Sequence, residues 1–83
     1  MESIISQIID EYNTFYESAN QAIGRYKGRV LIYGALAVEI NNNFSTIKDE
    51  LAIRGYQIVR WSSISQDEDD YNEFAVRKGF HSI

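Results

Sequence analysis

The side chains that can carry out catalysis are few in this sequence of 83 residues. Nucleophilic catalysis needs a nucleophile beside a base. The chain has no cysteine, and its single histidine, His81, lies near the C-terminus, where chains tend to fray. The carboxylates Glu39, Asp49 and Glu50 lie near expected turns and exposed helix positions, without the cleft that general acid–base catalysis uses. We therefore expect no catalytic residues and predict that the protein is not an enzyme.

Sites for a cofactor or a metal ion also lack the residues that they need. Gly34 follows an expected strand, as the glycines of a nucleotide-binding turn do, but one glycine does not give the close backbone approach that several provide. One histidine without any cysteine does not match the ligand spacing of a zinc site. We expect no cofactor and no metal, which leaves a binding function.

Charge is distributed unevenly along the chain, whose formal net charge is −4. Residues 1–24 carry four acidic and no basic side chains, whereas residues 25–61 carry six basic and three acidic ones. The acidic run from Asp67 to Asp70 overlaps a capping-box pattern formed by Ser65 and Glu68. Acidic side chains stabilise a helix N-terminus, so we interpret this run as the start of a helix.

Length and composition predict one small cytoplasmic domain. Single domains run from about 50 to 250 residues, and the thin core of a short one is often supplemented by a partner subunit. The absence of cysteine agrees with a reducing compartment. Acidic residues near the N-terminus do not fit a signal peptide, and the longest apolar run is shorter than the roughly 20 residues of a membrane-spanning helix. We expect no contact with a membrane.

A long amphipathic helix is predicted over residues 3–23. Apolar side chains recur there at gaps of three and four, and Gly24 provides a stop signal. Such a helix is about 30 Å long, which exceeds the diameter of roughly 24–26 Å that size scaling gives for this chain length. We therefore expect a homodimer formed through the apolar stripe. The candidate self-association residues are Ile5, Ile9, Tyr12 and Tyr16.

The remaining pattern predicts an α+β fold in the order helix, strand, helix, strand, helix. Asn41-Asn42-Asn43 is both a turn signal and a helix-start signal, and helical spacing of apolar residues follows it. We expect the N-terminal and C-terminal helices to cover a small sheet. The elements expected after the first helix are a central strand-helix-strand unit over 29–62, with strands at 29–33 and 56–61 and a helix at 45–54, and a C-terminal helix over about 66–78.

Residues 34–40 fit two structures. Leu36, Ala37 and Ile40 match a turn and a half of helix, but the apolar run can also continue the preceding strand. A continuous strand over 29–40 would give a right-handed crossover with parallel pairing and a compact interaction module. The choice between helix and strand decides which function the sequence favours.

With a helix at 34–40, residues 28–61 resemble part of a winged helix-turn-helix domain. Ala37 and Ile40, together with Ile47 and Leu51, occupy the apolar positions that hold the two helices of such a motif together. The second wing strand has no candidate, because the residues from Ser65 onward predict a helix. The matching elements are a first strand at 29–33, a short helix at 34–40, a turn at 41–43, a recognition helix at 44–54 and a wing strand at 55–61.

This resemblance implies duplex DNA as a partner. Side chains near the start of the recognition helix would face bases and phosphates, and other basic residues would contact the DNA backbone, which supplies much of the affinity. The candidate nucleic-acid contacts are Arg25, Lys27, Arg29, Ser45, Thr46, Lys48, Arg54 and Arg60.

Two functions follow from these patterns. The first is a small non-catalytic regulatory domain, such as a bacterial or phage accessory protein, that docks on a protein partner and forms a dimer. Tyrosines such as Tyr12, Tyr16 and Tyr71 suit this function, because tyrosine combines apolar area with a polar tip at interfaces. The alternative is a DNA-binding transcriptional regulator of winged helix-turn-helix type. A helix over residues 34–40 favours the alternative, and a continuous strand excludes it.

Overall fold

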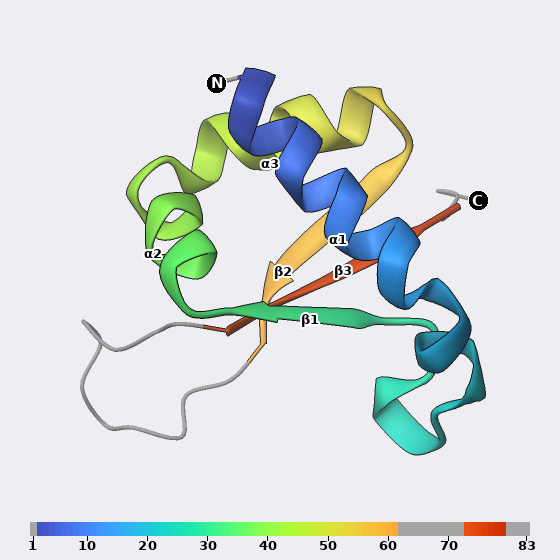
Figure 1. The fold of residues 1–83 in the computed structure, drawn as a ribbon. Helices are drawn as coiled ribbons and strands as arrows, with labels where there is room; N and C mark the ends of the chain where they lie inside the picture. Colours follow the sequence, from blue (N-terminus) through green and yellow to red (C-terminus); the bar gives the residue numbers. More distant parts are fainter. Residues whose placement is uncertain (1, 62–72, 80–83) are drawn as a thin grey trace.

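The structure is a computed structural model, and it describes residues 2–61 and 73–79 of the chain. It is an α+β protein, as the sequence predicts. None of the described helices combines the length and the apolar character that a membrane-spanning segment needs. The elements, labelled in Figure 1, are α1 (Glu2–Gln21), the 3-10 helix η1 (Gly24–Tyr26), β1 (Val30–Tyr33), α2 (Ala35–Asn42), α3 (Phe44–Ile53), β2 (Tyr56–Arg60) and β3 (Glu73–Lys78).

The three strands form one antiparallel sheet in the order β1-β3-β2. In the central strand, Val76 lies opposite Val30 of β1 and opposite Ile58 of β2. Side chains alternate between the two faces of a strand, so Val76 and Phe74 lie on one face of β3 while Ala75 lies on the other. All three are buried, and β3 is therefore covered on both faces.

The predicted C-terminal helix over 66–78 is wrong for residues 73–78, which form β3. Residues 66–72 lie outside the described residues. The prediction rested on a capping-box pattern and on acidic side chains at the expected helix start, each of which stabilises a helix by about 0.3–1 kcal/mol. Pairing with strands on both sides and burial of Phe74 and Val76 outweigh these contributions.

Residues 35–42 form the helix α2, which settles the structure of the ambiguous segment. Gly34 ends β1 with a φ of 78°, in a region that glycine adopts without the steric cost of a side chain. This conformation turns the chain out of the sheet, and Ala37 and Ile40 then pack into the core. The alternative with one strand over 29–40 and parallel pairing is wrong. A single residue, Asn43, separates α2 from α3.

The core lies between one face of the sheet and the helices α1, α2 and α3 (Figure 1). The expectation of a sheet covered by N-terminal and C-terminal helices is therefore replaced by a sheet covered by three helices that precede β2. Phe44 of α3 stacks on Phe74 of β3 with ring centroids 5.4 Å apart, which joins the helical layer to the central strand. The largest fully buried side chains are Ile5, Ile8, Ile40, Ile47, Leu51, Ile58, Phe74 and Val76.

The length of α1 does not exceed the size of the domain. Its 20 residues span about 30 Å, and the longest extent of the protein is also 30 Å. The radius of gyration is 12.3 Å. Twice that value understates the extent of a solid body, because atoms near the centre lower the radius of gyration. The length of α1 therefore gives no reason to expect a dimer.

Candidate functional site

The direction of the backbone hydrogen bonds in the sheet identifies an open edge. The Trp61 amide donates to the Glu73 carbonyl oxygen at 3.0 Å, so Glu73 directs its backbone groups toward β2. Successive residues of an antiparallel strand direct their backbone groups to alternate sides. Phe74 therefore faces β1, where it pairs with Ile32.

The residues that flank Ile32 in β1 direct their backbone groups the other way. Among residues 2–61 and 73–79, β1 is an edge strand, because β3 is its neighbour on one side and the sheet order places no strand on the other. By the same alternation, the amide and carbonyl groups of Leu31 and Tyr33 point out of this edge. Two donors and two acceptors thus lie in the plane of the sheet at positions where a further strand would bind.

A hollow of about 570 Å³ lies against this edge, between β1 and α1. Five consecutive residues, 29–33, line it. Because they alternate between the two faces of the sheet, the hollow follows the edge itself rather than either face. We call it the edge groove. Its lining residues are Glu11, Phe15, Ser18, Ala19, Ala22, Tyr26, Arg29, Val30, Leu31, Ile32, Tyr33 and Leu36.

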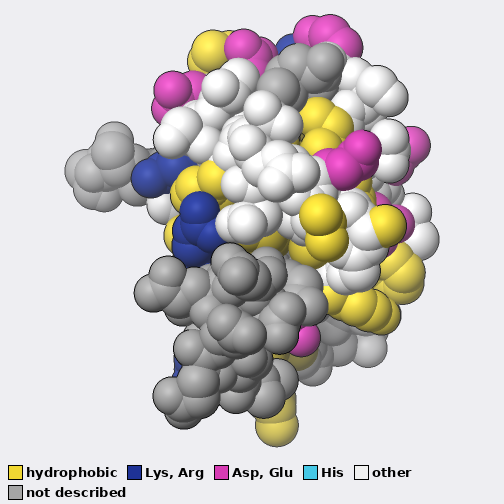
Figure 2. Space-filling view, turned by 90° about the vertical axis from the view of Figure 1, so that its left-hand side faces the viewer, with side chains coloured by type: hydrophobic (Ala, Val, Ile, Leu, Met, Phe, Trp, Pro, Cys, Tyr) yellow, Lys and Arg dark blue, Asp and Glu magenta, His cyan; other side chains and the backbone are white. Residues whose placement is uncertain are grey.

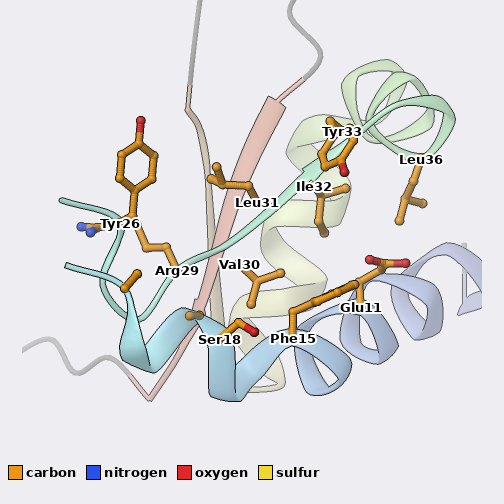
Figure 3. A pocket seen from close by; sticks show the side chains of 12 residues that line it. Glu11, Phe15, Ser18, Tyr26, Arg29, Val30, Leu31, Ile32, Tyr33 and Leu36 are labelled. Carbon is orange, nitrogen blue, oxygen red and sulfur yellow. The ribbon is translucent and has the colours of Figure 1, made fainter. Parts of the chain in front are cut away.

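The wall of the edge groove exposes large apolar side chains. Phe15 of α1 is 49% exposed, and Tyr33 at the end of β1 is 70% exposed. In Figure 3, Phe15 extends from α1 beneath β1, and Leu36 lies beyond the end of the strand, near Tyr33. Exposed apolar side chains that gather around a hollow are typical of an interaction site, whereas single ones are normal on any surface.

A charged residue lines each end of the edge groove, but the two belong to opposite faces of the sheet, since Glu11 lies on α1 and Arg29 lies over Trp61. Figure 3 shows Glu11 at the end of the groove nearest Tyr33 and Leu36, and Arg29 at the other end, before β1 begins. The strand between them, Val-Leu-Ile-Tyr, contains no charged residue and no proline. Edge strands of monomeric proteins are usually protected by their shortness, by lysine or proline, or by a bulge; β1 is short, with four residues, and contains no lysine or proline.

The predicted self-association stripe faces the core of the protein itself. Ile5 and Tyr12 are 1% and 3% exposed, so neither offers a surface to a second copy. Ile9 is partly buried and packs against the core. Tyr16 is exposed and lines a second hollow with Lys78. The helical spacing is confirmed, but the thin core buries Ile5, Ile8, Tyr12 and Ala19 of the stripe and leaves Tyr16 exposed.

Tyr12 is the buried polar group of this stripe. Its ring meets the ring of Tyr56 edge-on, with centroids 5.5 Å apart, and packs beside Tyr16 at the same distance. Burial raises the pKa of the Tyr12 hydroxyl above its ordinary value of 10.0, and a backbone hydrogen bond at Lys78 opposes that rise. Tyr12 therefore serves the fold as a neutral side chain.

The predicted nucleic-acid contacts on α3 form a surface of mixed charge. Ser45, Thr46 and Lys48 are exposed, as the resemblance requires, and Asp49 beside them is exposed as well. On the side of the molecule that carries α2 and the start of α3, basic atoms form small separate patches among polar, apolar and acidic atoms (Figure 2). This surface does not present the continuous positive charge that attracts a polyanion.

Arg54 and Arg60 lie at opposite ends of β2 and make different contacts. Arg54 pairs with Glu50 at 2.8 Å and with Glu2 at 2.9 Å, so its charge is balanced within the protein. Arg60 donates to the side-chain oxygen of Asn41 and lies over the ring of Phe44, 4.5 Å from its centroid. Arg60 therefore belongs to the surface that begins α3, and Arg54 belongs to the opposite end of that helix.

A third basic group surrounds Trp61. Arg25 and Arg29 lie over its ring at 5.0 and 5.2 Å from the centroid, and the Tyr26 ring packs against it with centroids 5.5 Å apart. Lys27 beside them is exposed. Alternation along β2 places Trp61 and Arg60 on opposite faces of the sheet. The basic middle of the sequence is thus divided among three places rather than gathered on one surface.

Sequence reasoning missed the edge groove. Phe15 and Leu36 follow an ordinary helical pattern, and Leu31 and Tyr33 read as part of a buried strand. The order of strands in the sheet makes β1 an edge, and β3, which fixes that order, was predicted as a helix. The strand without lysine or proline was the one available signal.

Among residues 2–61 and 73–79, no group of three histidine, cysteine, aspartate or glutamate side chains lies close enough to hold a metal ion. His81 lies outside these residues. Comparisons of the chain with models of known protein families, with curated proteins and with solved structures found no match.

Proposed function

We propose that this protein is a small non-catalytic binding domain that docks an extended segment of a protein partner in the edge groove. One observation carries the proposal: a hollow with exposed apolar walls lies along a sheet edge whose backbone groups point outward. An extended peptide that adds to a sheet edge gains affinity from main-chain hydrogen bonds and specificity from alternate side chains. The edge groove offers both.

The binding geometry follows from the strand. A partner segment would bond to the backbone of Leu31 and Tyr33, and every second side chain of the segment would enter the space between β1 and Phe15 of α1. Because β1 has four residues, few main-chain bonds form. Apolar contacts in the groove must therefore supply much of the affinity.

Selection from a phage-displayed library of random peptides, with the whole chain as bait, tests this function. We expect enriched peptides with alternating apolar residues, which shift the NMR amide signals of Leu31 and Tyr33. Tyr33→Lys should weaken the binding of these peptides about tenfold or more, because a charged edge opposes strand addition. Ile53→Lys is the matched control, since Ile53 is an exposed apolar residue at the end of α3. Peptides that shift only amides of α3, or no enrichment at all, would contradict the proposal.

A second candidate function is duplex DNA binding by a winged helix-turn-helix domain. The specific observation in its favour is the helix α2, joined to α3 through Asn43 and followed by the β2–β3 pair. This order supplies the second wing strand that the sequence did not offer. Ser45, Thr46 and Lys48 would then face the DNA.

Fluorescence anisotropy with duplex DNA over a range of salt concentrations tests the second function. Each phosphate that a protein neutralises contributes about −0.9 to the slope of log affinity against log salt. If Lys48 and Arg60 are the contacts, the slope is about −1.8, and Lys48→Ala lowers its magnitude by about half. No binding at low salt removes DNA as a partner. The mixed charge around α3 is the reason that we place this function second.

A further inference from the structure

We propose that the segment held in the edge groove is β1 of a second copy of this chain, so that two β1 strands pair antiparallel about a two-fold axis. The sheet then continues through six strands, in the order β2-β3-β1 followed by β1-β3-β2 of the second copy. This inference rests on the proposed function and names the partner that the edge groove accepts. Two features of the groove support it.

The outward-facing backbone groups of one β1 match those of β1 in a second copy of the chain. A two-fold axis through Ile32 places Leu31 opposite Tyr33 of the second copy, and Tyr33 opposite its Leu31. Both residues direct their amide and carbonyl groups outward, so each opposite pair exchanges two hydrogen bonds, as a hydrogen-bonded antiparallel pair requires. If the register were moved by one residue, an outward-facing residue of one β1 would lie opposite a residue of the other β1 whose backbone already bonds to β3. The edge therefore fits itself in the register centred on Ile32.

The apolar surface of the groove also continues across the axis. On the outer face of the sheet, Val59, Ala75 and Leu31 form a row across the three strands, and Tyr33 of the second copy extends that row. The axis is perpendicular to the sheet, so both α1 helices lie on the same face and each Phe15 flanks the new strand pair. An isologous contact of this kind closes on itself and leaves no β1 edge for a third copy, while β2 forms both outer edges of the six-stranded sheet.

The size of the interface sets a requirement on this dimer. Stable protein interfaces bury about 1,200–2,000 Å² in total, and two paired strands of four residues fall short of that area alone. Phe15, Tyr26 and Leu36 of both copies must therefore contribute. All three line the groove, and Phe15 and Tyr26 are 49% and 46% exposed.

Sedimentation equilibrium of the whole chain over a wide concentration range tests the dimer. We expect a reversible monomer–dimer equilibrium that Tyr33→Lys weakens about tenfold or more and that Ile53→Lys leaves unchanged. The register has its own test, because the natural chain lacks cysteine. A mixture of Leu31→Cys and Tyr33→Cys chains should form the mixed disulfide faster than either variant forms its own, since these positions lie opposite each other.

Several results would overturn the inference. A monomer at all concentrations does so, as does a dimer that Tyr33→Lys leaves intact or a mixed disulfide that forms no faster than the others. The proposed function stands separately: if the chain is monomeric but selected peptides still shift the amides of Leu31 and Tyr33, the groove docks another protein. If neither a second copy nor a peptide binds there, both proposals fail.

Discussion

The edge groove and the surface formed by α2 and α3 differ in the hydrogen bonding of their backbone groups and in the exposure of their apolar side chains. Along the groove, backbone groups of β1 face outward and Phe15 and Tyr33 are exposed. On the α2–α3 surface, the backbone groups inside each helix bond within that helix, and Arg60 already has contacts with Asn41 and Phe44. Covering a surface that has unpaired backbone groups and exposed apolar area lowers the free energy of the system. The comparison therefore favours the groove as the binding surface.

The largest expected effect separates the two sides of β1. Ile32→Pro removes an amide that bonds to β3 and disturbs a buried position, so it should lower the free energy of unfolding by about 3 kcal/mol or more. Leu31→Pro removes an amide that faces the open edge, and proline is tolerated at such positions, so its cost should be much smaller. Urea unfolding of both variants measures the difference. Equal losses of stability in the two variants would mean that the amides of Leu31 and Ile32 do not differ in their bonding.

An intermediate effect compares the two surfaces through binding. Phe15→Ser should weaken groove-binding peptides, and the self-association, by about tenfold, because it removes apolar area at the groove wall. It should change folding stability by less than about 1 kcal/mol, because the side chain is half exposed. Lys48→Ser is the matched change on α3 and should leave both affinities unchanged. A loss of affinity in Lys48→Ser would indicate that the binding surface lies on α3 instead of the groove.

The smallest effect distinguishes the buried and exposed faces of α1. Burial raises the pKa of Tyr12 in the folded protein, so the neutral form is favoured by folding. The contribution of Tyr12 is complete below pH about 10 and is lost as the pH rises through its raised pKa. Thermal unfolding between pH 9 and about 11 should therefore show a steeper loss of stability for the natural chain than for Tyr12→Phe. Parallel pH profiles for the two proteins would contradict this assignment.

The sequence predicted the elements whose signals are local. The stripe of α1, the strand β1 and the spacing of Ile47 and Leu51 in α3 all follow from periodicity. The α+β class was predicted correctly for the same reason. The segment after Gly34 was left open, because an apolar run of that length fits either structure.

The errors lie where tertiary contacts outweigh local preference. β3 was predicted as a helix, since its pairing with two distant strands leaves no local signal beyond its apolar residues. The stripe of α1 was assigned to a dimer, although Ile5 and Tyr12 are needed by the core. The edge groove depends on the order of the strands, so no part of it followed from spacing alone.

Amide hydrogen exchange within β1 tests the central claim, that its open edge is the docking surface, most directly. In dilute protein, the amides of Val30 and Ile32 should exchange slowly, because they bond to β3, and those of Leu31 and Tyr33 should exchange fast. At high protein concentration, or with a selected peptide, the account predicts strong protection of Leu31 and Tyr33. Fast exchange of these two amides under every condition would contradict it.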